Sequence, residues 1–279
     1  MKGKVYIDGY YKQLLDDFKN AVEKHKTSIV IIFDGKSGKG KTTLSNQTGY
    51  YLFPDFNLIN IYYEPDKFLK GLANAKPGSY HSFDEAMILS SRSAMSTVNK
   101  MIIQAMSMIR SKKIYVSFCV NSIFDLDRNL VLSRADALMH VYGEGLVDRG
   151  RFATFFKAKG DNFDRVKLLY LYGKKYYDYS KPRANFIGRF TKEFIVDERK
   201  YEAEKQIAID RFLIQEPTTK RQKSYEALIY KLVRFDGYKT KDVANYAEVS
   251  TETIRRILNR FENTPETPEI QQNTNHNNI

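Results

Sequence analysis

The sequence predicts an α/β fold with a mostly parallel sheet, followed by a small all-helical C-terminal domain. Three observations predict this class. Runs rich in β-branched and aromatic residues alternate with amphipathic stretches over the first two-thirds of the chain, which is typical of a sheet with helical crossovers. A glycine-rich loop at 35–42 separates one such run from a helix-compatible stretch. A polar, proline-containing stretch at 216–222 then precedes three short helical patterns.

The remaining elements are expected from apolar spacing and from turn residues. A helix at 12–24 carries apolar residues at helical spacing, and a helix at 66–75 is expected to be capped by Asp66 and ended by Pro77-Gly78. The methionine-rich stripe of a longer helix at 93–109 is expected to face the core. Further expected elements are a helix at 197–215 and strands at 58–63 and 113–121.

The glycine-rich loop fits the pattern G-x-x-x-x-G-K-[ST] at every fixed position and directly follows the apolar run 28–34. Glycines let consecutive backbone N–H groups curl around phosphate oxygens, and a helix beginning at Lys41 adds its positive dipole end. Lys41 would reach the β- and γ-phosphates of a nucleotide, and the Thr42 hydroxyl would bind Mg²⁺. A glycine- and lysine-rich surface turn is the alternative. The predicted nucleotide contacts are Gly35, Lys36, Ser37, Gly38, Lys39, Gly40, Lys41, Thr42 and Thr43.

Two adjacent carboxylates, Asp84 and Glu85, end the strand-like run 79–85. In a parallel sheet the carboxyl end of a strand faces the ligand crevice, and successive residues there point in different directions. We therefore predict that Asp84 serves Mg²⁺ and that Glu85 orients and deprotonates the attacking water. The alternative is that both acids merely begin the next helix, where negative charge suits the helix dipole.

A third strand-like run, at 113–121, ends in Asn121. An amide at this strand tip would bind the γ-phosphate or the attacking water, and Ser117 is the second candidate for that role. Because Asn is common in turns, Asn121 merely starting a turn is an equal alternative.

The phosphate loop, the acids Asp84 and Glu85 at a strand end and Asn121 together resemble the P-loop ATPases with a RecA-like sheet, an added central strand and a catalytic glutamate. Over roughly the first two-thirds of the chain, the spacing of these motifs is most similar to FtsK- and HerA-like translocases, viral genome-packaging ATPases and zonular-occludens-toxin-like proteins. Many members carry Gln where this chain has Asn121. The resemblance implies Mg²⁺-dependent ATP hydrolysis in a ring-like homo-oligomer, with an arginine supplied by a neighbouring subunit. The candidates are Arg134 and Arg128, followed by Arg149 and Arg151.

Two aromatic, β-prone runs at 151–159 and 165–172, joined by Gly160-Asp161-Asn162, predict a β-hairpin. Its basic and aromatic residues could stack bases or follow phosphates. A sheet extension whose aromatic side chains fill the core is the favoured interpretation, because aromatic strands usually pack inward.

Residues 223–262 predict three short helices, the last two with the apolar spacing of a helix-turn-helix. Thr240 and Ser250 are the expected caps, and Glu248 stands where glycine often makes the turn. The pattern resembles small DNA-binding domains, which implies that the helix from Ser250 enters the major groove. A three-helix domain that binds protein, or packs on the rest of the chain, is the alternative. The implied base-edge contacts are Thr251, Glu252 and Arg255, and the implied phosphate contacts are Arg256, Arg260 and Lys241.

The expected organisation is an ATPase domain at 1–200, a helix and linker at 201–222, the helix-turn-helix domain at 223–262 and a disordered tail at 263–279. The last segment is expected to lack structure because it is rich in Pro, Asn, Gln and Thr.

Composition limits the possible functions. The chain has 279 residues and a net charge of +12, which favours a polyanionic partner, either nucleic acid or anionic lipid. Together with the helix-turn-helix pattern, this makes duplex DNA the expected partner. Its single cysteine, Cys119, excludes an intrachain disulfide, and its four histidines show no metal-ligand spacing. No signal-like start and no apolar run near the ~20 residues that span a bilayer occur, so a cytoplasmic protein without a membrane anchor is expected.

Together these patterns predict an ATP-hydrolysing, DNA-binding motor or switch of a virus, plasmid or other mobile element. A nucleotide-switched regulator of replication, partition or transcription is the main alternative. A nucleotide or sugar kinase is disfavoured by the adjacent acids and the helix-turn-helix pattern, and a membrane-associated assembly ATPase stays open.

Overall fold

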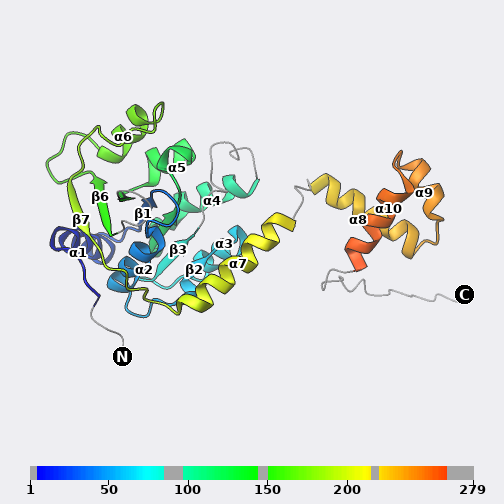
Figure 1. Ribbon diagram of the computed structural model, residues 1–279, viewed down its shortest axis with the longest axis horizontal. Coiled ribbons are helices and arrows are strands. Elements are labelled where there is room, and N and C mark those ends of the chain that lie inside the picture. Colours follow the sequence, from blue (N-terminus) through cyan, green and yellow to red (C-terminus); the bar gives the residue numbers. More distant parts are fainter. Residues whose placement is uncertain (1–4, 85–96, 144–149, 215–219, 263–279) are drawn as a thin grey trace, which may run out of the picture. The chain divides into compact units, whose positions relative to one another are not determined.

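The computed structural model describes residues 5–84, 97–143, 150–214 and 220–262. The chain divides into two compact units, Met1–Ile209 and Asp210–Ile279. The first unit holds a β-sheet with helices on both faces, and the second is helical (Figure 1). None of the helices in the described ranges is long and apolar enough to cross a membrane.

A seven-stranded sheet with the order β2-β3-β4-β1-β5-β6-β7 forms the centre of the first unit (Figure 1). Strands β1 to β5 run parallel, whereas β6 and β7 extend the sheet as antiparallel strands. This arrangement confirms the predicted mostly parallel α/β class. The strands are β1 (Ile29–Asp34), β2 (Ile61–Tyr62), β3 (Tyr80–Phe83), β4 (Tyr115–Cys119), β5 (Ala137–Tyr142), β6 (Arg151–Phe156) and β7 (Phe186–Arg189).

Helices cover the sheet on both faces. Side chains of α1, α2 and the start of α7 pack on one face, and those of α3, α4, α5 and α6 pack on the other. Every residue of β1 is buried, as expected for a central strand between two helical layers. The helices are α1 (Gly9–Lys24), α2 (Lys41–Leu52), α3 (Pro65–Ala73), α4 (Thr97–Met108), α5 (Arg128–Arg134), α6 (Arg165–Gly173) and α7 (Glu198–Ile214).

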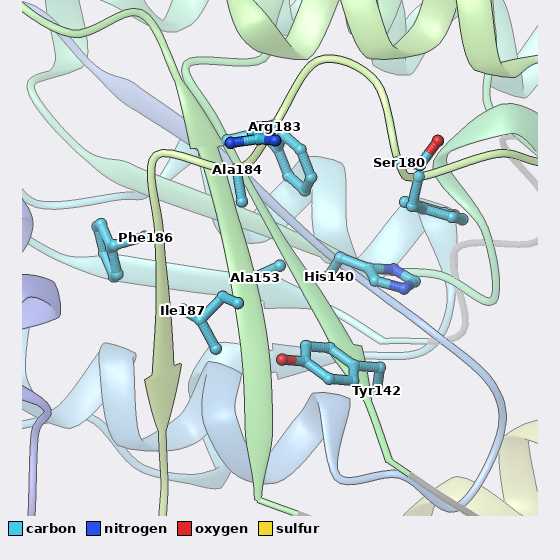
Figure 2. A pocket seen from close by; sticks show the side chains of 10 residues that line it. His140, Tyr142, Ala153, Ser180, Arg183, Ala184, Phe186 and Ile187 are labelled. Carbon is cyan, nitrogen blue, oxygen red and sulfur yellow. The ribbon is translucent and has the colours of Figure 1, made fainter.

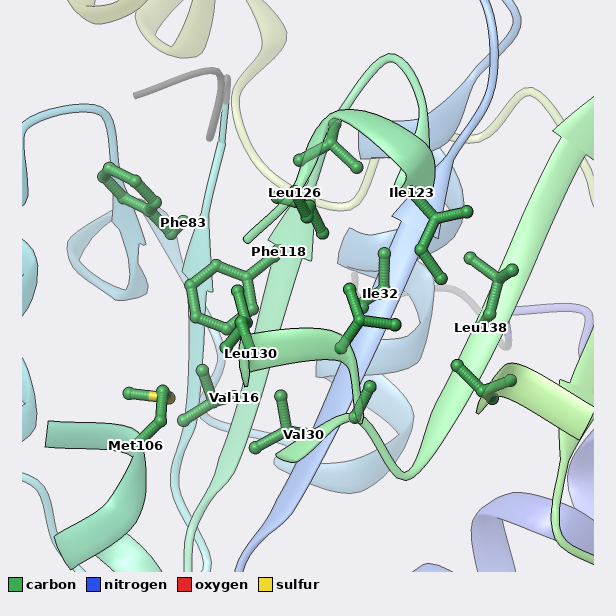
Figure 3. Close-up of a cluster of buried hydrophobic side chains, with 14 of the residues drawn as sticks. Val30, Ile32, Phe83, Met106, Val116, Phe118, Ile123, Leu126, Leu130 and Leu138 are labelled. Atoms are coloured by element: carbon green, nitrogen blue, oxygen red, sulfur yellow. The ribbon is translucent and has the colours of Figure 1, made fainter. Parts of the chain in front are cut away.

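Alternation along β1 divides its side chains between the two cores. Val30 and Ile32 lie in the core that Figure 3 shows, together with Leu138 of β5 and Leu130 of α5. Ile31 and the neighbouring odd-numbered residues face the core under α1 and α2. Two opposed cores of this kind fix the position of β1, and therefore of the loop that follows it.

The predicted β-hairpin is wrong in its second arm. Residues 165–172 belong to helix α6, which Asp164 caps by accepting the N–H groups of Val166 at 3.0 Å and Lys167 at 3.2 Å. The β-prone composition is outweighed by helical spacing, because the buried residues of α6 recur every three or four positions. The partner of β6 is β7 instead, which places Gly188 opposite Phe152.

Other predicted elements are present with shifted ends. The strand predicted at 58–63 is reduced to β2, because 58–60 forms a 3-10 turn. Glu64 rather than Asp66 occupies the N-cap position of α3, and Pro65 begins the helix. The helix predicted at 93–109 is α4, whose expected first residues, 93–96, lie outside the described ranges.

The second unit contains α8 (Lys220–Arg234), α9 (Thr240–Tyr246) and α10 (Thr251–Glu262). Apolar side chains of all three helices meet in one small core, formed by Ile229, Val243, Ala244, Ile254, Ile257 and Leu258. Helix α8 begins at Lys220, so the stretch 220–222 is helical rather than part of a linker.

Of the two helix caps predicted in the second unit, the one at Ser250 is present and the one at Thr240 is not. Ser250 caps α10, because its Oγ accepts the N–H of Thr253 at 3.1 Å. Thr240 does not cap α9: Lys239 occupies the N-cap position, and no side chain accepts a bond there. Between the helices, Glu248 adopts a left-handed conformation with φ of 53°, which is the turn geometry that glycine usually provides.

Candidate functional site

The predicted phosphate loop leaves the carboxyl end of β1 and enters α2. Its glycines hold backbone angles that other residues rarely adopt, with φ of 135° at Gly35 and 99° at Gly40. A Cβ at Gly35 would lie 2.0 Å from the carbonyl oxygen of Val141, and one at Gly40 would lie 2.9 Å from the ring of Phe190. The loop therefore follows a path that requires glycine at both positions.

The N-terminal end of α2 opens onto this loop. Gly40 is its N-cap residue, and no side chain caps the helix there. The first N–H groups of a helix have no intrahelical acceptor, and they attract anions together with the positive end of the helix dipole. The geometry at 40–43 therefore fits a phosphate group.

Lys41 and Asn121, 80 positions apart in the chain, meet at this edge of the sheet. The Lys41 Nζ donates to Asn121 Oδ1 at 3.2 Å and to the carbonyl oxygens of Gly35 at 2.9 Å and Lys36 at 3.3 Å. The Gly35 N–H also donates to the Asn121 carbonyl oxygen at 3.2 Å. Ser117, the second candidate for the strand-tip role, instead bonds Ser45 of α2 inside the protein.

Thr42 and Asp84 also meet, as the sequence predicts for the two metal ligands. The Thr42 Oγ1 donates to Asp84 Oδ1 at 3.2 Å and Oδ2 at 3.4 Å. Asp84 directly follows β3 and is 2% exposed. A hydroxyl and a carboxylate are oxygen ligands of the kind that Mg²⁺ prefers. Glu85, the predicted base, lies outside the described residues.

Two residues of α7 that no sequence motif singles out contact the same carboxylate. The Tyr201 hydroxyl donates to Asp84 Oδ2, and the Lys205 Nζ lies 3.8 Å from that oxygen. Burial, followed by the charge of Asp84, raises the pKa of Tyr201 far above its usual range, so the hydroxyl keeps its proton. One signal was present: Tyr201 is the single aromatic residue within the strongly charged stretch 197–210.

The residue before the loop, Asp34, is fully buried and accepts three hydrogen bonds. Its donors are the His140 Nδ1 at 2.8 Å, the Ile123 N–H at 2.8 Å and the Tyr179 hydroxyl at 2.5 Å. Burial and the charge of Asp34 raise the pKa of Tyr179 well above its usual range. This network fixes the end of β1 where the loop begins.

His140 and Tyr179 also line a pocket of about 550 Å³ on the β5–β6–β7 part of the sheet. Their rings stack with centroids 3.7 Å apart. Figure 2 shows His140 of β5 on one side of this pocket and Phe186 of β7 on the other, with Ala153 of β6 between them. The pocket is largely apolar and opens to solvent, and its link to the loop runs through the ring of His140 and Asp34.

The predicted arginines lie at different edges of the sheet. Arg128 begins α5 and is exposed, soon after Ile123, whose N–H bonds Asp34 beside the loop. Arg134 ends α5 just before β5, where the neighbouring Asp136 N–H bonds Val30 near the start of β1. Arg134 therefore lies toward the amino edge of the sheet, away from the loop. Arg151 is the first residue of β6, and Arg149 lies outside the described residues.

The predicted DNA contacts all lie on the second unit, and most are exposed. These exposed residues are Lys241, Ser250, Thr251, Glu252, Arg255 and Arg256. Arg260 differs, because its guanidinium donates to Glu226 Oε2 at 3.0 Å and Glu226 is buried. This bond holds Arg260 within its own unit.

The strand order around β1, the loop at its carboxyl end and Asp84 at the end of β3 together form a P-loop NTPase-like fold. No protein-family model and no curated protein matches the chain. Among solved structures, the N-terminal domain of zonular occludens toxin from Neisseria meningitidis is similar over 63% of this chain and 98% of that one, at 19% identity and a TM-score of 0.39.

Two further solved structures are similar over about half of the chain. The genome packaging NTPase of Sulfolobus turreted icosahedral virus 2, in complex with ATP-gammaS, matches over 46% of this chain and 92% of that one, at 12% identity and a TM-score of 0.34. C. elegans PCH-2 matches over 49% of this chain and 44% of that one, at 16% identity and a TM-score of 0.32.

Proposed function

We propose that this protein is an Mg²⁺-dependent ATPase that acts on duplex DNA. The observation that carries the proposal is the meeting of four side chains from three segments at one edge of the sheet. Lys41 contacts Asn121, and Thr42 contacts Asp84, at the entrance to an uncapped helix. A glycine-dependent loop beside these pairs fits a polyphosphate, and their oxygen atoms fit a divalent cation.

Each residue has a proposed role in hydrolysis. Lys41 would donate to the β- and γ-phosphates, and Asn121 would orient the γ-phosphate or the attacking water. Thr42 and Asp84 would hold Mg²⁺, which when bound would offset the negative charge of the phosphate oxygens. Glu85, next to Asp84 in the sequence, would accept the proton of the attacking water.

A homo-oligomer would complete this site with an arginine from a neighbouring copy. Arg128 is the stronger candidate, because it is exposed and follows the segment that bonds Asp34. Arg134 is less suited to this role, because it is only partly exposed and lies toward the opposite edge of the sheet.

The second unit would provide the DNA contacts. The exposed arginines Arg255 and Arg256 on α10, the cap at Ser250 and the left-handed turn at Glu248 support a helix-turn-helix role. Arg255 would read a base edge, and Arg256 with Lys241 would contact phosphates. Arg260 is left out of this set, because Glu226 holds its guanidinium.

The test is steady-state ATP hydrolysis by the full chain with Mg²⁺, without DNA, with single-stranded DNA and with duplex DNA. We expect hydrolysis in all three conditions and several-fold stimulation by the duplex. Nucleotide binding with negligible turnover in every condition would favour the nucleotide-switched regulator. A chain that binds no nucleotide at all would refute the proposed function.

The DNA contacts are tested separately with Arg255→Ala/Arg256→Ala. We expect weaker duplex binding and a less steep dependence of the binding constant on salt, by about one counterion for each lost phosphate contact. Arg234→Ala is the matched control, because Arg234 pairs with Glu262 within the same unit. Equal duplex affinity and salt dependence for the double variant and the wild type would exclude α10 as the DNA-contacting element.

A further inference from the structure

The Asp84 carboxylate is contacted from two sides, by α2 and by α7. Thr42 of α2 lies nearest to Oδ1, at 3.2 Å. Tyr201 donates to Oδ2, and the Lys205 Nζ approaches the same oxygen at 3.8 Å. The two carboxylate oxygens are therefore distinguished, because the donors of α7 gather at one of them.

The Tyr201 ring is fixed within an aromatic cluster. Its centroid lies 5.0 Å from that of Phe194 and 5.8 Å from that of Tyr63, and the side chain is 2% exposed. The Tyr63 hydroxyl donates to the backbone carbonyl oxygen of Tyr201 at 3.4 Å. A phenol held in this way can keep a carboxylate in one rotamer, since neither the ring nor its backbone is free to turn.

The start of α7 is itself tied to α2. The Gln47 Nε2 donates to the carbonyl oxygens of Thr191 at 3.0 Å and Glu193 at 2.8 Å, in the segment that leads to α7. Asp197 then caps α7 by accepting the Lys200 N–H at 3.1 Å. The position of Tyr201 relative to the phosphate loop is therefore defined through the same helix that carries Lys41 and Thr42.

We propose that Tyr201 is a positioning residue for the divalent cation: by binding Asp84 Oδ2, it holds Oδ1 beside Thr42 Oγ1 as a paired oxygen site. This inference rests on the proposed function, which assigns Asp84 and Thr42 to the cation. Residues that bond to metal ligands orient them, and their loss typically lowers metal affinity about 10- to 100-fold. Tyr201 would act through Asp84 without touching nucleotide.

The experiment measures Mn²⁺ binding to the full chain in the presence of ADP, with free Mn²⁺ followed by electron paramagnetic resonance. Tyr201→Phe removes the hydroxyl and keeps the ring, so we expect Mn²⁺ affinity to fall about tenfold or more. ADP affinity measured with EDTA should be unchanged. The matched control is Tyr170→Phe, because this buried hydroxyl donates to the Leu126 carbonyl oxygen at 2.9 Å and belongs to the core on the other face of the sheet. Its Mn²⁺ affinity should equal that of the wild type.

Asp84→Asn separates failure of this inference from failure of the proposed function. If Asp84→Asn loses Mn²⁺ while Tyr201→Phe keeps wild-type affinity, Tyr201 does not position the cation and only this inference is overturned. If the wild type and Asp84→Asn bind Mn²⁺ equally, the proposed cation site itself is wrong. A lower melting temperature of Tyr201→Phe with unchanged Mn²⁺ affinity would show a purely structural role and would also overturn the inference.

Discussion

Lys41→Ala should lower kcat/KM for ATP by at least about 100- to 1000-fold, the range found when one preorganised donor to a developing negative charge is removed. The Lys41 ammonium is already aimed at the loop, where it donates to the carbonyl oxygens of Gly35 and Lys36 and to Asn121. It also carries a full positive charge, so its loss removes charge-assisted bonds to phosphate. ATP binding should weaken as well, because the ground state shares part of this interaction. Steady-state hydrolysis and nucleotide titration measure both effects.

Two further variants test whether the loss of hydrolysis is specific to the proposed nucleotide site. Lys67→Ala removes an exposed lysine that pairs with Glu64 on the surface, and it should hydrolyse ATP like the wild type. Glu85→Gln should bind ATP normally but lose hydrolysis, because only the proposed base is altered. Hydrolysis by Lys41→Ala at the wild-type rate would remove the loop at 35–42 from the active site.

Asp34→Ala should destabilise the first unit by about 3–5 kcal/mol, because a hydrogen-bond donor that loses its acceptor inside a protein costs about 1–3 kcal/mol and Asp34 accepts three bonds. The carboxylate is fully buried and accepts bonds from His140, Ile123 and Tyr179. Alanine would leave these three donors without their shared acceptor. Thermal unfolding should show a melting temperature lower by roughly 10 °C, given about 2–4 °C per kcal/mol for a unit of this size.

The control for this prediction is Asp17→Ala, which removes an exposed carboxylate from α1. Its effect should stay within about 0.5 kcal/mol, as is usual for surface positions. Asp34→Asn should fall between the two, because an amide oxygen can still accept one of the three bonds. If Asp34→Ala has the same melting temperature as the wild type, the hydrogen bonds of Asp34 contribute nothing to stability.

The parts of the site that could be predicted are those encoded locally or by a general rule of sheets. The loop at 35–42 is one contiguous motif, and its conformation follows from where its glycines stand. The contacts of Asp84 with Thr42 and of Asn121 with Lys41 could be expected because parallel strands place their carboxyl ends at one edge of the sheet. Neither expectation required the structure of the chain between the two residues.

The parts that could not be predicted depend on contacts between distant segments. Tyr201 reaches Asp84 across 117 positions, and nothing in the local pattern of α7 specifies that partner. Arg260 belongs to a basic helix by its sequence, yet its pairing with Glu226 depends on how α8 and α10 pack.

The misassigned helix α6 has a different cause. Its Val and Tyr residues have high β-propensity, which competed with a helical spacing that was also present in the sequence. The cap at Asp164, followed by buried residues three and four positions apart, was the more reliable indication. The spacing of the buried residues, rather than the β-propensity of single residues, therefore determines that this segment is helical.

Both outer strands of the sheet are short: β2 has two residues and β7 has four. Few backbone groups are therefore left unpaired at the margins, and Arg189 adds a charge at one of them. Short, charged margins discourage the edge-to-edge strand pairing by which sheets of separate molecules aggregate. Association of copies of this chain by extending one another's sheets is therefore disfavoured.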